Sequence, residues 1–106
     1  MTKDEVKVIL KIPYKLLVLT ALSYVNLTDR ELNILILRYM RGKTQQETAE
    51  ELFCTVNGLQ KWEKIALDKC RQAWEKLIFV QELLKAVQYW AAFLCVLLVL
   101  SFNRLV

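Results

Sequence analysis

The feature that most constrains this chain is its scarcity of chain-breaking residues. Glycine and proline occupy only three of its 106 positions, Pro13, Gly42 and Gly58. Tight turns between strands need such residues, and here long stretches rich in Leu, Ala, Lys and Glu run without any of them. The length allows one small domain and an appendage. We therefore expect an all-α protein, a small helical bundle followed by a C-terminal hydrophobic helix.

The composition argues against an enzyme and against a metal site. The chain has no histidine, so it lacks the commonest general base and the commonest metal ligand. Its three cysteines, Cys54, Cys70 and Cys95, are widely spaced and form no Cys-x-x-Cys pair, which indicates neither a zinc site nor a disulfide framework. We expect no catalytic residues, no cofactor and no metal. The net charge of +4 suits a polyanionic partner without requiring one.

Residues 1–26 form a first helical segment. Val6, Ile9 and Leu10 have the spacing of a short amphipathic helix over residues 3–11. Pro13 ends or kinks that helix, because the residue before a proline is displaced from the helical region. The apolar run over residues 14–25 is too short to span a bilayer, and it predicts a buried core helix.

The segment over residues 27–77 carries the clearest local signals. Thr28 and Glu31 have the Thr-x-x-Glu spacing of a capping box, in which each side chain bonds the backbone amide of the other residue. The helix that follows is expected to stop at Gly42, since glycine readily adopts the left-handed conformation found just beyond helix ends.

A second capping box follows two residues after that glycine. Thr44 and Glu47 predict the start of a short helix that carries Ala49, Leu52 and Phe53. Thr55 can cap a long helix from residue 56 towards residue 77. Its apolar positions keep helical spacing: Leu59, Trp62, Ala66, Leu67, Cys70, Trp74 and Leu77. A short helix, a tight turn and a long helix are the spacing of a helix-turn-helix, although two capped helices of an ordinary bundle would look the same.

Four groups of residues in this segment agree in identity and spacing with a known family. They are Leu27-Thr28-Asp29-Arg30-Glu31; Leu37-Arg38-Tyr39; Gly42-Lys43-Thr44 followed by Glu47 and Ala49; and Glu63, Ala66, Leu67, Lys69 and Arg71. Together they resemble the fourth conserved region of bacterial sigma factors, over residues 27 to about 72. The resemblance implies a helix-turn-helix that binds double-stranded DNA and regulates transcription, with RNA polymerase as a further partner.

The resemblance also assigns roles to individual positions. The base-reading candidates are Val56, Asn57, Gln60 and Lys61. A helix fits the major groove, where Lys61 would donate to guanine and Asn57 or Gln60 would pair with adenine. The candidates for phosphate contacts, which position a protein without specifying sequence, are Arg38, Lys43, Lys64 and Arg71. For Lys64 and Arg71 a solvated helix face is the alternative interpretation.

The departures from the family pattern concern the DNA target. Val56 stands where primary sigma factors usually have an arginine, and Phe53-Cys54 replaces a turn that usually contains glycine. Gly58 lies inside the expected helix at a cost of about 1 kcal/mol relative to alanine, either for a close approach to DNA or because the usual element is no longer read. The family's target sequence is therefore not carried over. No counterpart of sigma region 2 is found, so we expect half of a split factor, a mobile-element regulator, or a stand-alone repressor or activator.

The segment over residues 78–106 ends in a hydrophobic tail. Residues 86–103, AVQYWAAFLCVLLVLSFN, carry no charge and lie between Lys85 and Arg104. Eighteen helical residues span about 27 Å, just short of the hydrocarbon core of a bilayer. Tyr89 and Trp90 suit the interfacial region. With no breaker after Arg71, the long helix is expected to run almost directly into this tail.

These observations predict a cytoplasmic DNA-binding domain anchored to the cell membrane through residues 86–103. Two alternatives remain. In the first, the tail is the interface of a soluble homodimer. In the second, a small membrane or oligomeric helical protein uses its head to bind a protein partner, such as RNA polymerase, without contacting DNA.

Overall fold

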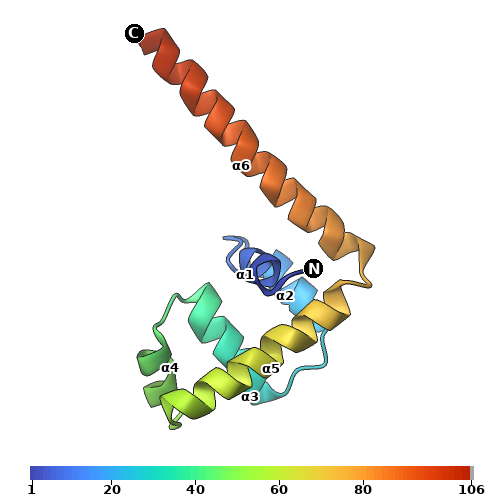
Figure 1. The fold of residues 1–106 in the computed structure, drawn as a ribbon, viewed down its shortest axis with the longest axis vertical. Helices are drawn as coiled ribbons and strands as arrows, with labels where there is room; N and C mark the ends of the chain where they lie inside the picture. The colour runs from blue at the N-terminus through green and yellow to red at the C-terminus, as the bar shows by residue number, and fades with distance from the viewer. Residues whose placement is uncertain (106) are drawn as a thin grey trace.

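The structure is a computed structural model that describes the backbone of residues 1–105 and the side chains of residues 1–90, 94, 98 and 101. It contains α1 (Lys3–Leu10), α2 (Lys15–Ser23), α3 (Asp29–Leu35), the π-helical turn η1 (Ile36–Met40), α4 (Gln45–Glu51), α5 (Val56–Trp74) and α6 (Ile78–Leu105). The described residues include no strand, so the prediction of an all-α fold is confirmed. Figure 1 shows a bundle of helices from which α6 extends.

The N-terminal segment is folded onto the rest of the head. Thr2 caps α1 through a complete capping box with Glu5, which the sequence analysis did not identify. Val6, Ile9 and Leu10 are fully buried, as their spacing predicts. Helix α1 packs against α5, η1 and α6.

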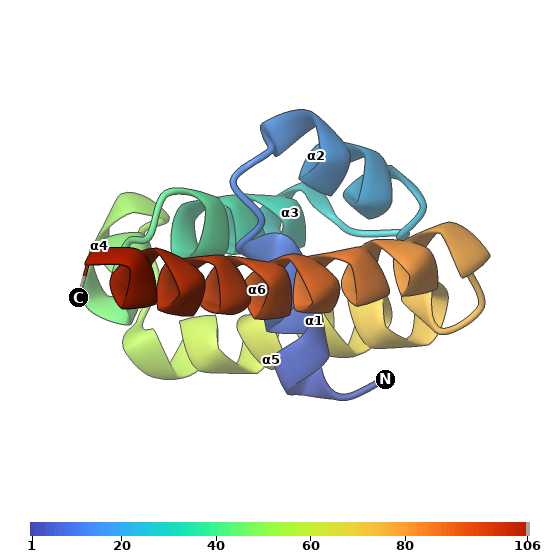
Figure 2. The same cartoon turned by 90° about the horizontal axis from the view of Figure 1, so that it is seen from above.

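Helix α2 is buried on one face only, so the prediction of a buried core helix over residues 14–25 is correct for that face. Val18, Ala21 and Leu22 are buried, whereas Leu16 is 81% exposed. The run is apolar on both faces, but α2 lies at the edge of the bundle, where a neighbouring helix covers only one side (Figure 2).

The core forms around α5, which is the central helix of the head. Trp74 is fully buried, and its indole N–H donates to the carbonyl of Ala21 at 2.9 Å. This bond satisfies the single polar group of the largest buried side chain. Cys70 lies one turn earlier, and burial raises the pKa of its thiol to about 12. A smaller apolar cluster of Ile34, Ala49 and Leu59 holds α4 against α3 and α5.

The long helix does not run into the tail, and that prediction is wrong. Helix α5 ends at Trp74, residues 75–77 form a turn, and α6 begins at Ile78 and folds back across α1 (Figure 2). Long-range burial rather than a breaker residue causes the turn. The backbone N–H of Leu77 and the side-chain amide of Gln81 both donate to the carbonyl of Trp74. Val80 and Leu84 then join the main core.

The predicted membrane-spanning helix over residues 86–103 is without support. No helix within the described residues combines the length and the apolar character needed to cross a bilayer. Most side chains of residues 91–103 lie outside the described part of the chain.

Candidate nucleic-acid interface

A short helix, a tight turn and a long helix are present as predicted. Thr44 caps α4 with a complete capping box: its hydroxyl accepts from the amide of Glu47 at 3.1 Å, and its own amide donates to the Glu47 carboxylate at 3.2 Å. These bonds hold the pKa of Glu47 below its ordinary value of 4.5. The small side chain of Ala49 is buried against Ile34 and Leu59, so α4 can approach α3 and α5 closely.

The first capping box forms only in part. The hydroxyl of Thr28 accepts from the amide of Glu31 at 3.3 Å, but the carboxylate of Glu31 does not return to Thr28. That carboxylate is 2% exposed and accepts from the ammonium of Lys69 on α5 at 2.8 Å. Its second oxygen is buried without a protein partner. The predicted reciprocal bond is therefore wrong, because an ion pair between α3 and α5 replaces it.

The two turns differ in how they adopt the left-handed conformation. Gly42 has φ 67° and ends η1 as predicted, and the amide of Lys43 bonds back to the carbonyl of Leu37. In the turn between α4 and α5, Phe53 has φ 55° and is 96% exposed. We expected Phe53 on the α4 helix. That expectation is wrong, since α4 ends at Glu51.

The base-reading candidates share the first two turns of α5. Val56, Asn57, Gln60 and Lys61 are all exposed to solvent. Thr55 caps this end by accepting from the amide of Gly58 at 3.1 Å. A Cβ at Gly58 would lie 3.2 Å from that same hydroxyl oxygen, so the glycine makes room for the cap. The side-chain amide of Gln60 donates to that of Gln45 at 3.1 Å, which links the two helices at their exposed ends.

The phosphate candidates are not equivalent. Arg38 is held inside the head, with one bond to Glu63 at 3.3 Å and one to the carbonyl of Lys43 at 2.8 Å. Lys43 itself pairs with Glu51. Lys64 is exposed and makes no ion pair within the described residues.

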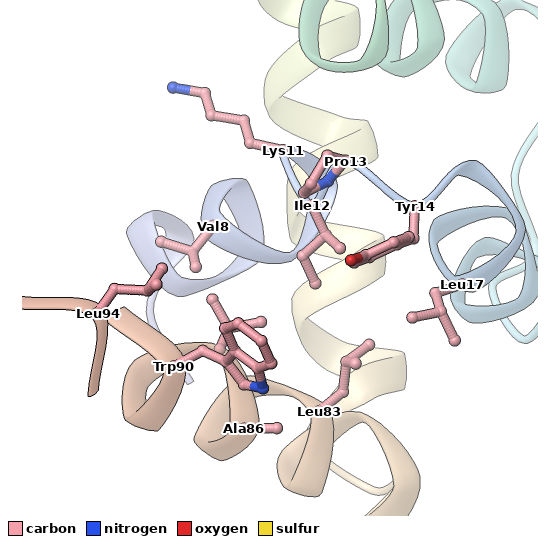
Figure 3. A pocket seen from close by; sticks show the side chains of 11 residues that line it. Val8, Lys11, Ile12, Pro13, Tyr14, Leu17, Leu83, Ala86, Trp90 and Leu94 are labelled. Carbon is pink, nitrogen blue, oxygen red and sulfur yellow. The ribbon is translucent and has the colours of Figure 1, made fainter. Parts of the chain in front are cut away.

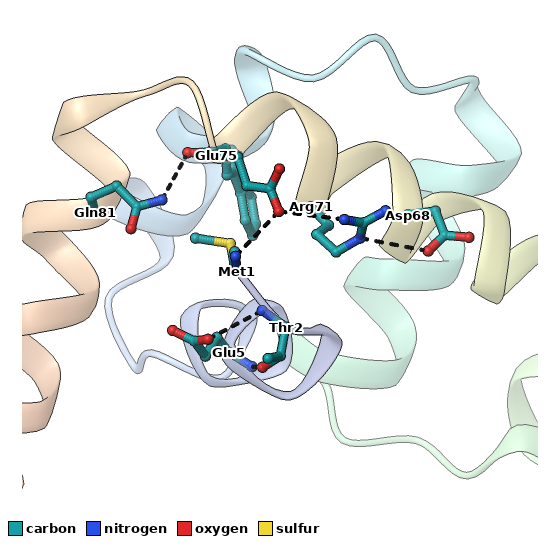
Figure 4. A network of polar contacts seen from close by, with 8 residues as sticks. Met1, Thr2, Glu5, Asp68, Arg71, Glu75 and Gln81 are labelled. Atoms are coloured by element: carbon teal, nitrogen blue, oxygen red, sulfur yellow. Dashed lines mark hydrogen bonds and ion pairs between the residues drawn. The ribbon is translucent and has the colours of Figure 1, made fainter.

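Arg71 lies apart from the other candidates. Ten residues of helix separate it from Lys61, which is about 15 Å along the axis. Its guanidinium approaches Glu75 at 3.3 Å and Asp68 at 4.0 Å (Figure 4). The amino group of Met1 also donates to Glu75, and this bond keeps the pKa of that carboxyl below its ordinary value. The surroundings of Arg71 favour a role in joining the N-terminus to α5.

A buried polar cluster fixes α5 against η1. Glu63 is 6% exposed and accepts from Arg38 and from the hydroxyl of Tyr39, the latter at 2.7 Å. Burial, together with this bond to Glu63, raises the pKa of Tyr39 well above its ordinary range. Tyr39 therefore remains a neutral donor, and the cluster sets the orientation from which α5 presents its exposed end.

Two cavities flank α1. One, of about 250 Å³, is polar and opens beside the base-reading candidates; Lys3 and Lys7 of α1 contribute to it, and the sequence analysis missed both. Their spacing of four residues places both on one face of α1, but it does not indicate which helix lies opposite. The other, of about 550 Å³, is apolar and lies between α1, the start of α2 and α6 (Figure 3). Ile12, Tyr14, Leu83 and Trp90 are among its lining residues.

Comparison with known proteins agrees with the resemblance seen in the sequence. Residues 25–72 match the family described as Sigma-70, region 4, which is a DNA-binding helix-turn-helix family and not an enzyme family. The match covers less than half of the chain, and sigma region 2 is not matched. No curated protein and no solved structure matches the chain.

Proposed function

We propose that this protein is a sequence-specific DNA-binding regulator of transcription that inserts the N-terminal end of α5 into the major groove of double-stranded DNA. The observation that carries the proposal is a row of exposed polar side chains, Asn57, Gln60 and Lys61, on a helix end that nothing in the head covers. The opposite face of α5 is buried, so the helix is rigidly oriented while its reading end stays free.

Each reading side chain has a base that suits its chemistry. The ammonium of Lys61 can donate to O6 or N7 of guanine, and the amides of Asn57 and Gln60 can pair with adenine. A well-formed pair discriminates against a wrong base by about 1–3 kcal/mol. Val56 offers only an apolar contact, which suits a thymine methyl group. In this proposal the turn from α4 to α5 sets the register on the groove.

The phosphate contacts follow from the ion pairs already made. Lys64 is available without breaking a pair. Lys43 would exchange Glu51 for a phosphate, which costs little, because an exposed ion pair is worth at most about 1 kcal/mol. Arg38 would keep its bond to Glu63 and offer its remaining N–H donors. RNA polymerase is a further proposed partner, supported by the family match alone.

The test is sequence preference on DNA. We would select sites from random duplexes with the full chain, then compare it with a Gln60→Ala/Lys61→Ala variant on selected and scrambled duplexes. The variant should bind both duplexes equally. A matched control, Gln72→Ala/Lys76→Ala, removes one amide and one ammonium from exposed positions near the other end of α5 and should keep the preference. Loss of preference in both variants, or in neither, would refute the assignment of the reading end.

We also propose that the C-terminal segment over residues 86–103 attaches this domain to a membrane. The support is the absence of charge in that segment and the exposure of Tyr89 and Trp90, at 76% and 65%. Such amphipathic aromatic side chains favour the membrane–water interface. A homodimer through the same helix is the alternative.

Lipid vesicles separate these two possibilities. The full chain should float with vesicles, and a Leu94→Glu/Leu98→Glu variant, changed at two exposed positions, should not. Sedimentation as a dimer that ignores vesicles would replace the membrane with a second copy of the chain.

A further inference from the structure

The polar cavity beside α5 is built by four elements, three of them consecutive and the fourth, α1, distant in sequence from the others. Lys3 and Lys7 come from α1, Arg38 from η1, Gln45 from the start of α4, and Gln60 and Lys64 from α5. Its volume is about 250 Å³. A water molecule occupies about 30 Å³ in the liquid, so the cavity has room for a tetrahedral oxyanion and part of its hydration.

The charges around this cavity are unbalanced. Four cationic side chains line it, and Glu63 is the only carboxylate among the described lining residues. Glu63 is nearly buried and is already bonded to Arg38 and Tyr39, so it offers little charge to the opening. Lys3 approaches Asp68 at 3.5 Å, but both side chains are more than a third exposed, and such a pair is weak. For Lys7 and Lys64 no ion pair occurs within the described residues.

The neutral residues of the cavity add hydrogen-bond donors. Gln45 accepts from the amide of Gln60, which leaves the NH₂ group of Gln45 free to donate. Ammonium and amide donors converging on a small concave space are the chemistry that binds a phosphate group. The position indicates its source, because Gln60 belongs both to this cavity and to the row of base-reading candidates.

We propose that this cavity binds a phosphate of the DNA backbone at the edge of the groove that α5 enters, with Lys7 and Lys64 as its direct ligands and Lys3 beside them. Helix α1, which lies outside the helix-turn-helix, thereby becomes part of the DNA interface. The proposal rests on the function proposed above, since the same duplex supplies the bases and the phosphate. It adds contacts that strengthen binding to every sequence alike.

The test is the salt dependence of binding by the full chain. Each phosphate contact contributes about 0.9 to the slope of log affinity against log salt concentration. A Lys3→Gln/Lys7→Gln variant should lower that slope by about 0.9, the contribution of one phosphate. It should also weaken binding to selected and scrambled duplexes by the same factor and keep the sequence preference. The control Lys11→Gln/Lys15→Gln removes the same charge at two exposed positions away from the cavity and should leave the slope within about 0.3 of the parent. Equal slopes in the two variants would overturn the proposal, provided that thermal unfolding shows both to be folded.

A second measurement separates failure of this proposal from failure of the proposed function. Inorganic pyrophosphate is titrated into the full chain while the side-chain amide signals of Gln45 and Gln60 are followed by nuclear magnetic resonance. If the chain binds no DNA, the proposed function fails, and amide shifts that vanish in Lys3→Gln/Lys7→Gln would assign the cavity to a free phosphate compound. Absence of both DNA binding and amide shifts would overturn the phosphate site itself.

Discussion

The two long helices of this protein use their apolar residues in opposite ways. Helix α5 has 19 residues, and its buried residues lie on one stripe that ends at Trp74. Helix α6 has 28 residues, yet among its described side chains only Val80 and Leu84 are buried. A helix with one apolar stripe can bury that stripe in the core of its own domain. A helix that is apolar on several sides keeps some apolar surface exposed, and a membrane or another protein can cover it.

The polar contacts follow the same division. In α5, Glu63 and Lys69 form ion pairs with residues of η1 and α3, 25 and 38 positions away in sequence. In the described part of α6, the one ion pair joins Lys85 to Glu82 on the same helix at 3.6 Å. Helix α5 is therefore tied to its neighbours by charge as well as by packing. Among the described side chains of α6 beyond Leu84, Ala86, Trp90 and Leu94 line the apolar cavity beside α1 (Figure 3).

The largest expected effect is a difference in stability between variants of two tryptophans, Trp74 on α5 and Trp90 on α6. Trp74→Ala removes a fully buried indole and leaves the carbonyl of Ala21 without its partner, so we expect a loss of about 3–5 kcal/mol in the free energy of unfolding. Trp90→Ala, at a position that is 65% exposed, should change it by less than about 0.5 kcal/mol. Urea unfolding followed by circular dichroism measures both. Similar losses in the two variants would break the contrast between α5 and α6.

The sequence predicted those helix boundaries that local chemistry sets. Thr44 with Glu47, Thr55, and Gly42 each fix a boundary through bonds or dihedral angles within a few residues. The end of α5 was missed because Trp74 and Gln81 meet only after α6 folds back. The partner of Glu31 was missed for the same reason, since Lys69 lies 38 residues away.

Some residues of the candidate site are placed by local sequence signals, and others only by long-range contacts. The exposed N-terminal end of α5 follows from helical spacing and from a resemblance confined to one continuous segment, so the sequence was enough to place Gln60 and Lys61 on it. The contribution of Lys3 and Lys7 depends on α1 crossing α5, which is a long-range contact that no pattern within either helix encodes. The sequence shows two lysines four residues apart, but it does not determine which helix packs beside them.

Phe53 sharpens the comparison, because it brings into the head an exposed apolar side chain of the kind found along α6. Its φ of 55° is unfavourable for any residue that has a Cβ. Its side chain is 96% exposed, so packing does not compensate for that strain. Phe53→Gly should raise the free energy of unfolding by up to about 1 kcal/mol, the gain being reduced by the greater freedom of glycine in the unfolded chain. Phe53→Leu keeps the strain and should change stability by less than half as much.

DNA affinity gives the Phe53 variants a second readout. Unchanged affinity in Phe53→Gly would mean that the strained turn serves neither folding nor binding. A stabilised variant with weaker DNA binding would place the phenyl ring in the interface. Destabilisation by Phe53→Gly would show that the ring packs on a surface of the head. Phe53 would then not be an exposed apolar side chain of the kind found along α6.

The smallest expected effect is a change in the pH dependence of stability, and it comes from the polar contacts at the cap of α4. The hydrogen bonds with Thr44 lower the pKa of Glu47 below 4.5, so the charged carboxylate stabilises the folded head. That contribution is complete above the ordinary pKa and is lost as the pH falls through the lowered one. Glu47→Gln keeps the geometry of the capping box but cannot titrate. Between about pH 6 and pH 3, a range that brackets the ordinary pKa of a glutamate, the free energy of unfolding should therefore fall less in this variant than in the parent protein.

Carbon chemical shifts of the Glu47 carboxyl test the cause directly. Thr44→Ala removes the hydroxyl that accepts from the Glu47 amide, and it should move the Glu47 pKa up towards its ordinary value while costing about 1 kcal/mol of stability as a lost cap. A Glu47 pKa at or above 4.5 in the parent protein would mean that the box is open in solution. Helix α4 would then be held to its neighbours by the packing of Ala49 and by the bond between Gln45 and Gln60. The head would have fewer polar contacts, and its contrast with α6 would be weaker.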